Sequence, residues 1–253
     1  MITCACGTHG VVYRDGGTAI KRFRSGAQST SPRAQAELEL ARTFPARNLV
    51  QVLAANVAEG WLAMEWLDGG SLAELAAREG ALSERFIVRA ALDVLAGLAV
   101  LHEYGLVHRD VKPANVMLDS RSGACKLIDW IGDEEEELSL RRGKPVGTPV
   151  FMAPEVAGRP HRHVEQSDSW ALGCTVVNLA SGRLPWEAAD ARGRTNEFMA
   201  MWKSAHGVAP PHDPAGWSPA LAAFVARCFE PDPARRARAR ELRGDGLFAQ
   251  FIQ

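Results

Sequence analysis

The pattern of apolar and polar positions divides the chain into a strand-rich first quarter and a mainly helical remainder. Residues 11–13 and 18–23 are strand-like, and the turn-forming residues 14–17 join them. Two further strands are predicted within 50–67, on either side of a turn near Gly60. We therefore expect a small β-rich lobe at the start of the chain.

Helical patterns interrupt and then replace the strands. Residues 34–44 have helix-forming composition with apolar positions on one face. Beyond the connector that starts at Asp68, Ser71 and Glu74 have the spacing of a capping box at the start of a short helix. A strongly periodic helix is predicted at 84–103. The pattern alone thus predicts a small β-rich lobe, a short connector and a larger helical lobe.

The bulk composition is that of an ordinary soluble globular protein. The chain has 253 residues, enough for one large domain or two lobes around a cleft. Its formal net charge of −1 provides no global field that would attract nucleic acid or an anionic membrane, so we expect neither as a partner. The most apolar window, 87–107, is interrupted by charged residues and is not expected to span a membrane. No secretory leader is recognisable, and five scattered cysteines favour a reducing, cytoplasmic location.

The strongest chemical signal is the stretch LVHRDVKPANVMLD at 106–119. Asp110 can accept a hydrogen bond from an attacking hydroxyl, Lys112 can neutralise a transferred phosphoryl group, and Asn115 offers a neutral oxygen to a metal. A predicted strand that ends on Asp129 could add a carboxylate to that metal site. A lone Asp or Asn would be better explained as part of a polar turn, but the full set is hard to explain in that way.

These residues, together with two later motifs, resemble a eukaryotic-type serine/threonine protein kinase domain. The later motifs are Gly-Thr-Pro to Ala-Pro-Glu within 146–156 and Ser-Asp-Ser-Trp-Ala-Leu-Gly at 167–173. Lys112, two residues after Asp110, resembles the serine/threonine class rather than the tyrosine class. Parts of the helical lobe, such as 173–186, resemble the mitogen-activated protein kinase kinase kinase group.

The resemblance covers essentially the whole chain and implies an α+β, bilobal protein kinase fold. The N-lobe would be a small antiparallel β-sheet with one helix, and the C-lobe would be larger and mainly helical. The implied divisions of this single domain are an N-lobe at 1–64, a hinge at 65–69, a C-lobe at 70–253 and an activation segment at 129–155.

The resemblance implies that ATP binds between the lobes. Lys21 would contact the α- and β-phosphates and would be oriented by Glu37 of the predicted helix. Gly7 and Gly10 would let backbone N–H groups approach the phosphates. Ala5 stands where the family has its first glycine. The remaining residues implied for nucleotide binding are Val12, Ala19, Met64, Glu65, Leu67 and Met117.

On the acceptor side, the resemblance implies that Asp110 accepts the proton of a Ser or Thr hydroxyl and that Lys112 balances phosphate charge. Thr148 would contact both residues and help to position the acceptor. Asn115 and Asp129 would hold Mg²⁺. The stretch KLIDWIG departs from the family pattern, because Trp130 replaces a phenylalanine and Ile131 replaces a glycine.

Three further residues are implied to be structural. Glu155 would pair with Arg236, and Asp168 would anchor the backbone of the catalytic loop. The seven tryptophans, Trp170 and Trp186 among them, are predicted to be packing residues.

The function implied is transfer of the γ-phosphoryl group of ATP to a Ser or Thr hydroxyl of a protein, within a signalling cascade. The alternative from another class is a pseudokinase that acts as an ATP-binding or scaffold module, motivated by Ala5, Trp130 and Ile131. A small-molecule kinase is a third option, which the Gly-Thr-Pro to Ala-Pro-Glu segment disfavours.

Regulation is expected in the segment between Asp129 and Glu155. Arg109 is of the type that receives an activation-loop phosphate, and Ser139 is the candidate phosphosite, modified by an upstream activator or by autophosphorylation. One alternative is that a glutamate of the acidic run 133–137 substitutes for the phosphate. Another is that this run is simply a solvated loop.

Overall fold

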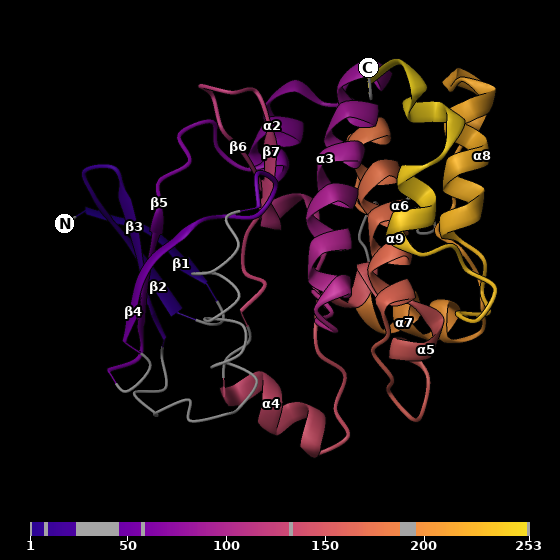
Figure 1. The fold of residues 1–253 in the computed structure, drawn as a ribbon. Coiled ribbons are helices and arrows are strands. Elements are labelled where there is room, and N and C mark those ends of the chain that lie inside the picture. Colours follow the sequence, from indigo (N-terminus) through magenta and orange to yellow (C-terminus); the bar gives the residue numbers. More distant parts are fainter. Residues whose placement is uncertain are drawn as a thin grey trace.

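The fold was analysed on a computed structural model with two lobes (Figure 1). The structure describes residues 2–7, 10–23, 46–56, 59–131, 134–187 and 196–251, and only the backbone of residues 2–7, 134–137, 250 and 251. In Figure 1 the β-sheet lies on one side, and α3 separates the short β6–β7 hairpin from α6, α8 and α9. The predicted α+β, bilobal arrangement is confirmed.

The smaller lobe is built on a five-stranded antiparallel sheet in the order β1-β2-β3-β5-β4. β1 pairs with β2, β2 with β3 and β4 with β5, whereas β3 pairs with β5 rather than with β4. Its strands are β1 (Ile2–Gly7), β2 (Gly10–Asp15), β3 (Thr18–Phe23), β4 (Val52–Asn56) and β5 (Trp61–Glu65).

The register of this sheet gathers four side chains on the face that looks toward the larger lobe. Ala19 pairs with Met64, and Lys21 pairs with Leu62. Cross-strand partners share a face of the sheet, and residues two apart on a strand do so as well. The buried side chain of Lys21 therefore lies among the apolar side chains of Ala19, Leu62 and Met64.

The larger lobe is mainly helical. Its long helices are α3 (Glu84–Glu103) and α6 (Glu165–Ser181), whose apolar residues fill the core. The other described elements of this lobe are α2 (Leu72–Glu79), η1 (Pro113–Asn115), β6 (Val116–Leu118), β7 (Cys125–Leu127), α4 (Glu134–Arg141), η2 (Pro149–Phe151), α5 (Pro154–Ala157), α7 (Glu197–Ala205), η4 (Pro214–Gly216), α8 (Pro219–Cys228), α9 (Ala239–Arg243) and η5 (Gly246–Phe251).

The segment before β4 is fastened to the larger lobe. Asn48 donates a side-chain hydrogen bond to Cys125 O at 3.0 Å, and its own carbonyl accepts from Leu127 N at 2.9 Å. Gly97 of α3 allows this close approach, because a Cβ at that position would stand 2.8 Å from Asn48 O. These contacts fix the segment before β4 relative to the strand 125–127 and to α3 of the larger lobe.

Two local predictions can be judged directly. The capping box of Ser71 and Glu74 is present at the start of α2, so that prediction is confirmed. The interpretation of residues 134–137 as a loop is wrong, since they form the first turn of α4. Glutamate has a high helix propensity, and carboxylates are favourable near a helix N-terminus. The helix predicted at 34–44 lies outside the described residues.

None of the helices in the described part of the chain is long and apolar enough to cross a bilayer.

Candidate active site

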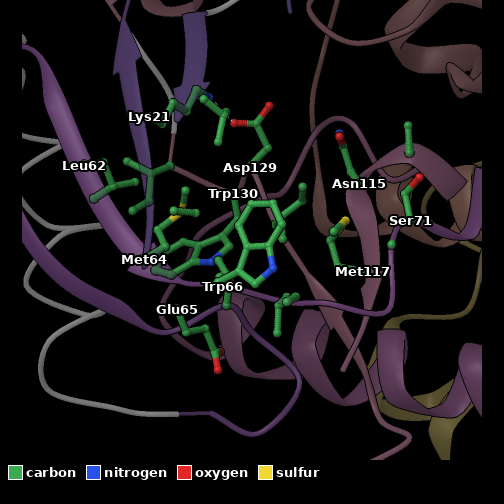
Figure 2. Close-up of a pocket in the computed structure, with 18 of the residues that line it drawn as sticks. Lys21, Leu62, Met64, Glu65, Trp66, Ser71, Asn115, Met117, Asp129 and Trp130 are labelled. Atoms are coloured by element: carbon green, nitrogen blue, oxygen red, sulfur yellow. Dashed lines mark hydrogen bonds and ion pairs between the residues drawn. The ribbon is translucent and has the colours of Figure 1, made fainter. Parts of the chain in front are cut away.

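A pocket of about 610 Å³ lies between the lobes, and residues from both line it (Figure 2). The sheet contributes Lys21, Leu62 and Met64, whereas the larger lobe contributes Asn115 and Asp129. Twelve of the residues predicted for nucleotide, metal or acceptor binding line it: Gly10, Val12, Ala19, Lys21, Met64, Glu65, Leu67, Asp110, Lys112, Asn115, Met117 and Asp129. Positions far apart in the sequence are therefore brought to one site.

Lys21 and Asp129 form an ion pair across the two lobes. The side chain of Lys21 is 10% exposed and that of Asp129 is 30% exposed, so one partner is enclosed and the other still reaches solvent. An ammonium group enclosed among apolar residues needs a counter-charge. Asp129 supplies it, and an anionic ligand in the same pocket could do the same.

The acceptor side of the pocket is a compact cluster around Asp110. Lys112 Nζ lies 2.6 Å from Asp110 Oδ2 and donates to Thr148 Oγ1 at 2.6 Å. Thr148 in turn donates its hydroxyl to Asp110 Oδ1 at 2.7 Å and its backbone N–H to the same oxygen at 2.9 Å. The predicted contacts of Thr148 with both residues are thus confirmed.

This cluster lowers the pKa of Asp110 below its ordinary value of 3.8. Burial by itself would raise the pKa, but the charge of Lys112 and the hydrogen bonds from Lys112 and Thr148 outweigh burial. Asp110 is accordingly a carboxylate at neutral pH and can accept a hydrogen bond from a hydroxyl.

Asn115 presents a free acceptor toward the pocket. Its side-chain N–H₂ group donates to Asp110 O at 2.8 Å and to Asp110 Oδ2 at 3.0 Å, which uses both of its hydrogens. No hydrogen-bond donor to its Oδ1 is found among the described residues. The side-chain carbonyl oxygen of this buried residue remains for another ligand.

Two residues in or beside the pocket hold backbone conformations that favour glycine. Arg109 has φ of 77° and Asp129 has φ of 62°. Such conformations cost about 1–3 kcal/mol each and persist where surrounding contacts impose them. At Arg109 the conformation is imposed by Asp168, because the carboxylate of Asp168 accepts hydrogen bonds from His108 N and Arg109 N, both at 2.9 Å. The predicted anchoring role of Asp168 is confirmed.

The connector between the lobes begins after Met64. The backbone N–H groups of its first two residues donate hydrogen bonds to other parts of the protein. Glu65 N donates to Gln51 O at 3.0 Å, and Trp66 N donates to Gly17 O at 2.9 Å. We find no protein acceptor for Leu67 N among the described residues. The buried Leu67 therefore offers a backbone donor at the edge of the pocket.

The Glu65 carboxylate makes two contacts that the sequence did not predict. It accepts from Lys126 Nζ at 2.5 Å and from Gln51 N at 2.8 Å. Because Lys126 belongs to β7 and Gln51 precedes β4, this carboxylate ties the connector to both lobes. No sequence signal pairs Glu65 with Lys126, because they are distant along the chain.

Tryptophans occupy the inner part of the pocket. Figure 2 shows the indoles of Trp66 and Trp130 in the middle of the site, between Asp129 and Glu65. Trp130 is 4% exposed, and its indole N–H has no hydrogen-bond partner among the described residues. Arg14 lies over the ring of Trp66, at 4.6 Å from its centroid. Trp130 is thus packed in the core, as predicted for the tryptophans, and it also lines the pocket together with Trp66.

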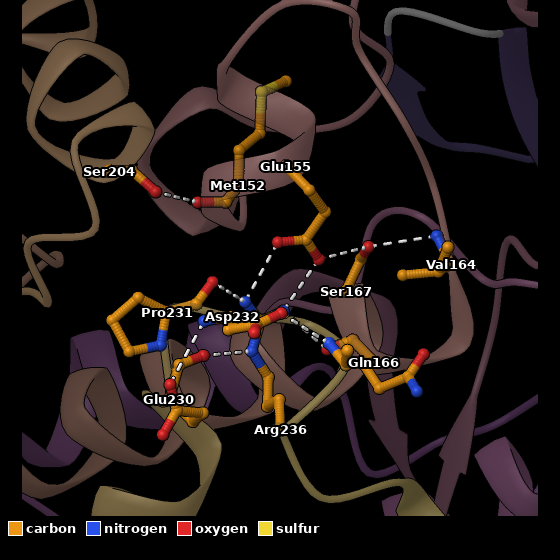
Figure 3. A network of polar contacts seen from close by, with 11 residues as sticks. Met152, Glu155, Val164, Gln166, Ser167, Ser204, Glu230, Pro231, Asp232 and Arg236 are labelled. Carbon is orange, nitrogen blue, oxygen red and sulfur yellow. Dashed lines mark hydrogen bonds and ion pairs between the residues drawn. The ribbon is translucent and has the colours of Figure 1, made fainter.

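Beneath the end of the activation segment lies a fully paired polar network (Figure 3). Arg236 donates to both oxygens of Glu155, at 2.7 and 2.9 Å, and to the backbone oxygens of Glu230, Gln166 and Pro231. Ser167 donates to the same Glu155 carboxylate at 2.7 Å. The predicted pair of Glu155 and Arg236 is confirmed.

Two predicted site residues cannot be placed fully. Glu37 lies outside the described residues, so its contact with Lys21 stays a prediction. Only the backbone of Gly7 is described, and it pairs with Gly10 at the tip of the first hairpin. A Cβ at Gly10 would stand 2.2 Å from Arg22 O, so glycine is required there for close packing of the strands.

The oxygen donors in the pocket fit a magnesium ion. Mg²⁺ prefers hard oxygen ligands and commonly takes one or two from the protein, with phosphate and water completing the set. Asn115 provides a free amide oxygen and Asp129 a partly exposed carboxylate, both on the pocket lining. These residues would hold the ion, which would supply charge neutralisation to bound phosphates.

A two-lobed fold whose cleft gathers these carboxylate, ammonium and amide groups has the architecture of a protein kinase. Comparison of the sequence with known families shows the same, because the protein kinase domain matches residues 7–248. The chain belongs to the protein kinase family.

The chain is similar to several mitogen-activated protein kinase kinase kinases. It is 35% identical to the human kinase kinase kinase 6 over 94% of its length, and 32% identical to the mouse kinase kinase kinase 1 over 77%. The Dictyostelium discoideum kinase kinase kinase A is 32% identical over 81% of the chain. The chain spans only 13% to 21% of the length of these relatives.

Among solved structures, the fold is similar to a crystal structure of Rad53 1–466 in complex with AMP-PNP. The TM-score is 0.74 at 20% identity, and the match covers 97% of this chain and 63% of that one. At this identity the likeness supports the fold alone.

Proposed function

We propose that this chain is an ATP-dependent serine/threonine protein kinase that transfers the γ-phosphoryl group to a protein hydroxyl. The observation that carries the proposal is the cluster of Asp110, Lys112 and Thr148, in which Asp110 is held as a carboxylate beside an ammonium group. A hydroxyl presented to this cluster would donate its hydrogen to Asp110. Lys112 would balance the charge of the phosphoryl group as it moves.

The nucleotide would occupy the pocket between the lobes. Lys21 would exchange its contact with Asp129 for the phosphates, and the free N–H of Leu67 would bind the edge of the adenine. Support comes from the lining of the pocket and from the structurally similar Rad53, which was crystallised with AMP-PNP. Asn115 and Asp129 would hold the accompanying Mg²⁺.

A transfer assay with matched variants tests the proposal. Purified protein is incubated with labelled ATP, Mg²⁺ and protein acceptors, beside Asp110→Asn and Lys21→Met. Exposed residues of α3 provide controls of the same chemical change, Glu103→Gln and Arg85→Met. We expect label in the wild type and both controls, and a loss of about 10²- to 10⁴-fold in Asp110→Asn. Equal, background labelling of wild type and Asp110→Asn would refute the proposal.

A pseudokinase that binds ATP as a scaffold is the second candidate. It is favoured by Trp130 and Ile131, which are buried and line the pocket where the family has a phenylalanine and a glycine. Titration with a fluorescent ATP analogue separates the two functions. Nucleotide binding that depends on Lys21, without any transfer, would establish this second candidate.

We further infer that Ser139 is the regulatory phosphosite, modified by an upstream activator or by autophosphorylation in a cytoplasmic signalling cascade. Support comes from Arg109, whose Nε is buried and has no hydrogen-bond partner among the described residues. A phosphate could provide one. Mass spectrometry of active protein, together with the activity of Ser139→Ala, tests this. Full activity of that variant without phosphate would refute it and would favour a glutamate of 134–137 as the substitute.

A further inference from the structure

The carboxylate of Asp129 depends on a single protein partner. Among the residues that the structure describes, Lys21 provides its only hydrogen bond and its only ion pair, through Oδ1. Figure 2 shows the second carboxylate oxygen of Asp129 pointing away from Lys21. The Asp129 side chain is 30% exposed, so this carboxylate remains accessible to a ligand that enters the pocket.

A second carboxylate of the pocket, that of Asp110, is held in a different way. Lys112 Nζ lies 2.6 Å from it, but three further donors also bind it. These are the hydroxyl and the backbone N–H of Thr148, at 2.7 and 2.9 Å, and the side-chain N–H₂ group of Asn115, at 3.0 Å. Without its lysine, Asp110 would keep three hydrogen bonds, whereas Asp129 would keep none from the described part of the chain.

Lys21 in turn has little freedom to leave Asp129. Its side chain is 10% exposed, and no second carboxylate partner is found for it within the described residues. Its Nζ atom also lies 5.1 Å from the ring centroid of Phe23. An aromatic ring holds a cation more weakly than a carboxylate does, so an ammonium group enclosed in this way needs another anion before it can release Asp129.

The ion pair involves the same carboxylate that would hold Mg²⁺. The oxygens available to the ion are those of the Asp129 carboxylate and Oδ1 of Asn115. A divalent cation on this carboxylate would lie beside the ammonium group of Lys21, and like charges repel strongly where water is partly excluded. The single negative charge of Asp129 is thus a charge for which two cations compete.

We propose that Lys21 excludes the divalent metal from Asp129 until the phosphates of a nucleotide bind the Lys21 ammonium group. This inference rests on the proposed function and gives Lys21 a second role, as the residue that couples metal binding to nucleotide binding. Because such coupling is reciprocal, a metal on Asp129 would in turn free Lys21 for the phosphates. Without a nucleotide, Asp129 would keep the lysine as its counter-ion in place of the metal.

Binding of Mn²⁺ to the nucleotide-free protein tests this coupling. Mn²⁺ takes the same oxygen ligands as Mg²⁺, and electron paramagnetic resonance measures its free concentration. The wild type should bind Mn²⁺ weakly. Lys21→Met, which removes the charge, should bind Mn²⁺ about tenfold or more tightly, within the usual range of coupling between two ligands. Lys21→Arg keeps a permanent charge and should bind as weakly as the wild type.

Three further variants locate the effect and control for it. Lys21→Met/Asp129→Asn should lose the gain in affinity, because the carboxylate is gone. Lys112→Met removes the same charge from the same pocket but leaves Asp110 with its three other hydrogen bonds, so it should change the affinity by a much smaller factor. Lys21→Gln is a second uncharged variant, to be used if chemical denaturation shows that Lys21→Met is unfolded.

The coupling is overturned if the folded, uncharged variants of Lys21 bind Mn²⁺ no more tightly than the wild type does. It is overturned equally if Lys112→Met or Lys21→Arg shows the same gain, or if the gain persists without the Asp129 carboxylate. No phosphoryl transfer enters this measurement, so the two proposals fail separately. A gain in Lys21→Met without transfer by the wild type removes only the proposed kinase activity, and transfer by the wild type without that gain removes only the coupling.

Discussion

Two charged regions of this molecule differ in how many hydrogen-bond and ion-pair partners the protein itself provides. At the pair of Glu155 and Arg236, the arginine has five hydrogen bonds to protein oxygens and lies 5.1 Å from the ring of Trp170. In the pocket, Lys21 has one carboxylate partner among the residues that the structure describes, Asp129, which is itself partly exposed. In the first region the protein provides every hydrogen bond that the buried charge can make. In the second region the ammonium group can still bind an anionic ligand.

The difference indicates which charges support the fold and which are available for chemistry. A buried charge with every hydrogen bond supplied by the chain gains nothing from a ligand, so its role is to hold segments together. A charge with one weakly shielded partner can exchange that partner for phosphate. Substitutions in the two regions should therefore separate stability from nucleotide binding.

The largest effect on stability is expected for Arg236→Met. The side chains of Arg236 and Glu155 are 0% and 9% exposed, and removing one partner of a buried pair costs about 3–5 kcal/mol. Chemical denaturation measures this loss. The adjacent Arg235→Met is the control, since that side chain is exposed and should change stability by no more than about 0.5 kcal/mol. If the two variants are equally stable, the closed network does not carry the fold.

Lys21→Met should have little effect on stability and a larger effect on nucleotide binding. Its ion pair is open to solvent on one side, so we expect the free energy of unfolding to change by about 1 kcal/mol or less. Nucleotide affinity should fall by about 1.5–3 kcal/mol, the usual contribution of a hydrogen bond to a charged group. Titration with a fluorescent ATP analogue measures this, with Arg85→Met as control. A Lys21→Met protein that is destabilised but binds nucleotide normally would reverse the comparison.

The parts of both regions that were predictable from the sequence are those encoded in short motifs. Asp110, Lys112 and Asn115 lie within six residues of one another, and Thr148 and Glu155 lie within one recognisable segment. Once the family resemblance placed these segments, their contacts followed. The capping box of Ser71 and Glu74 required even less, because it depends only on local spacing.

The unpredicted features depend on tertiary packing. Lys126 is an ordinary strand lysine until the fold brings it to Glu65. Trp202 has the helical spacing of a packing residue, and only the placement of α7 shows that it faces solvent. A solvated loop is one interpretation of the glutamates of α4 from the sequence, because charge runs commonly face water, and it is wrong because glutamate also has a high helix propensity.

A smaller effect is expected on the pKa of Asp110 in the cluster of Asp110, Lys112 and Thr148. Its folded pKa is lowered, so this carboxylate contributes stability above its unfolded value near 3.8, and that stability is lost as the pH falls through the folded pKa. In Lys112→Met the ammonium is gone, and we expect the pKa of Asp110 to rise, because burial would then be opposed only by the remaining hydrogen bonds and charges. Carbon-13 NMR titration, assigned with Asp110→Asn, measures it. An unchanged titration would mean that Lys112 does not set the charge of Asp110.

The pair of Glu65 and Lys126 lies between the two extremes and should give the smallest effect. Its side chains are largely enclosed, and the Glu65 carboxylate has one further partner, Gln51 N. Lys126→Met leaves that hydrogen bond in place, so we expect a loss of about 1 kcal/mol in stability. The connector next to Leu67 would become less fixed, so nucleotide affinity should fall slightly as well. If stability changes while nucleotide affinity does not, this pair belongs with Glu155 and Arg236 among the contacts that support the fold alone.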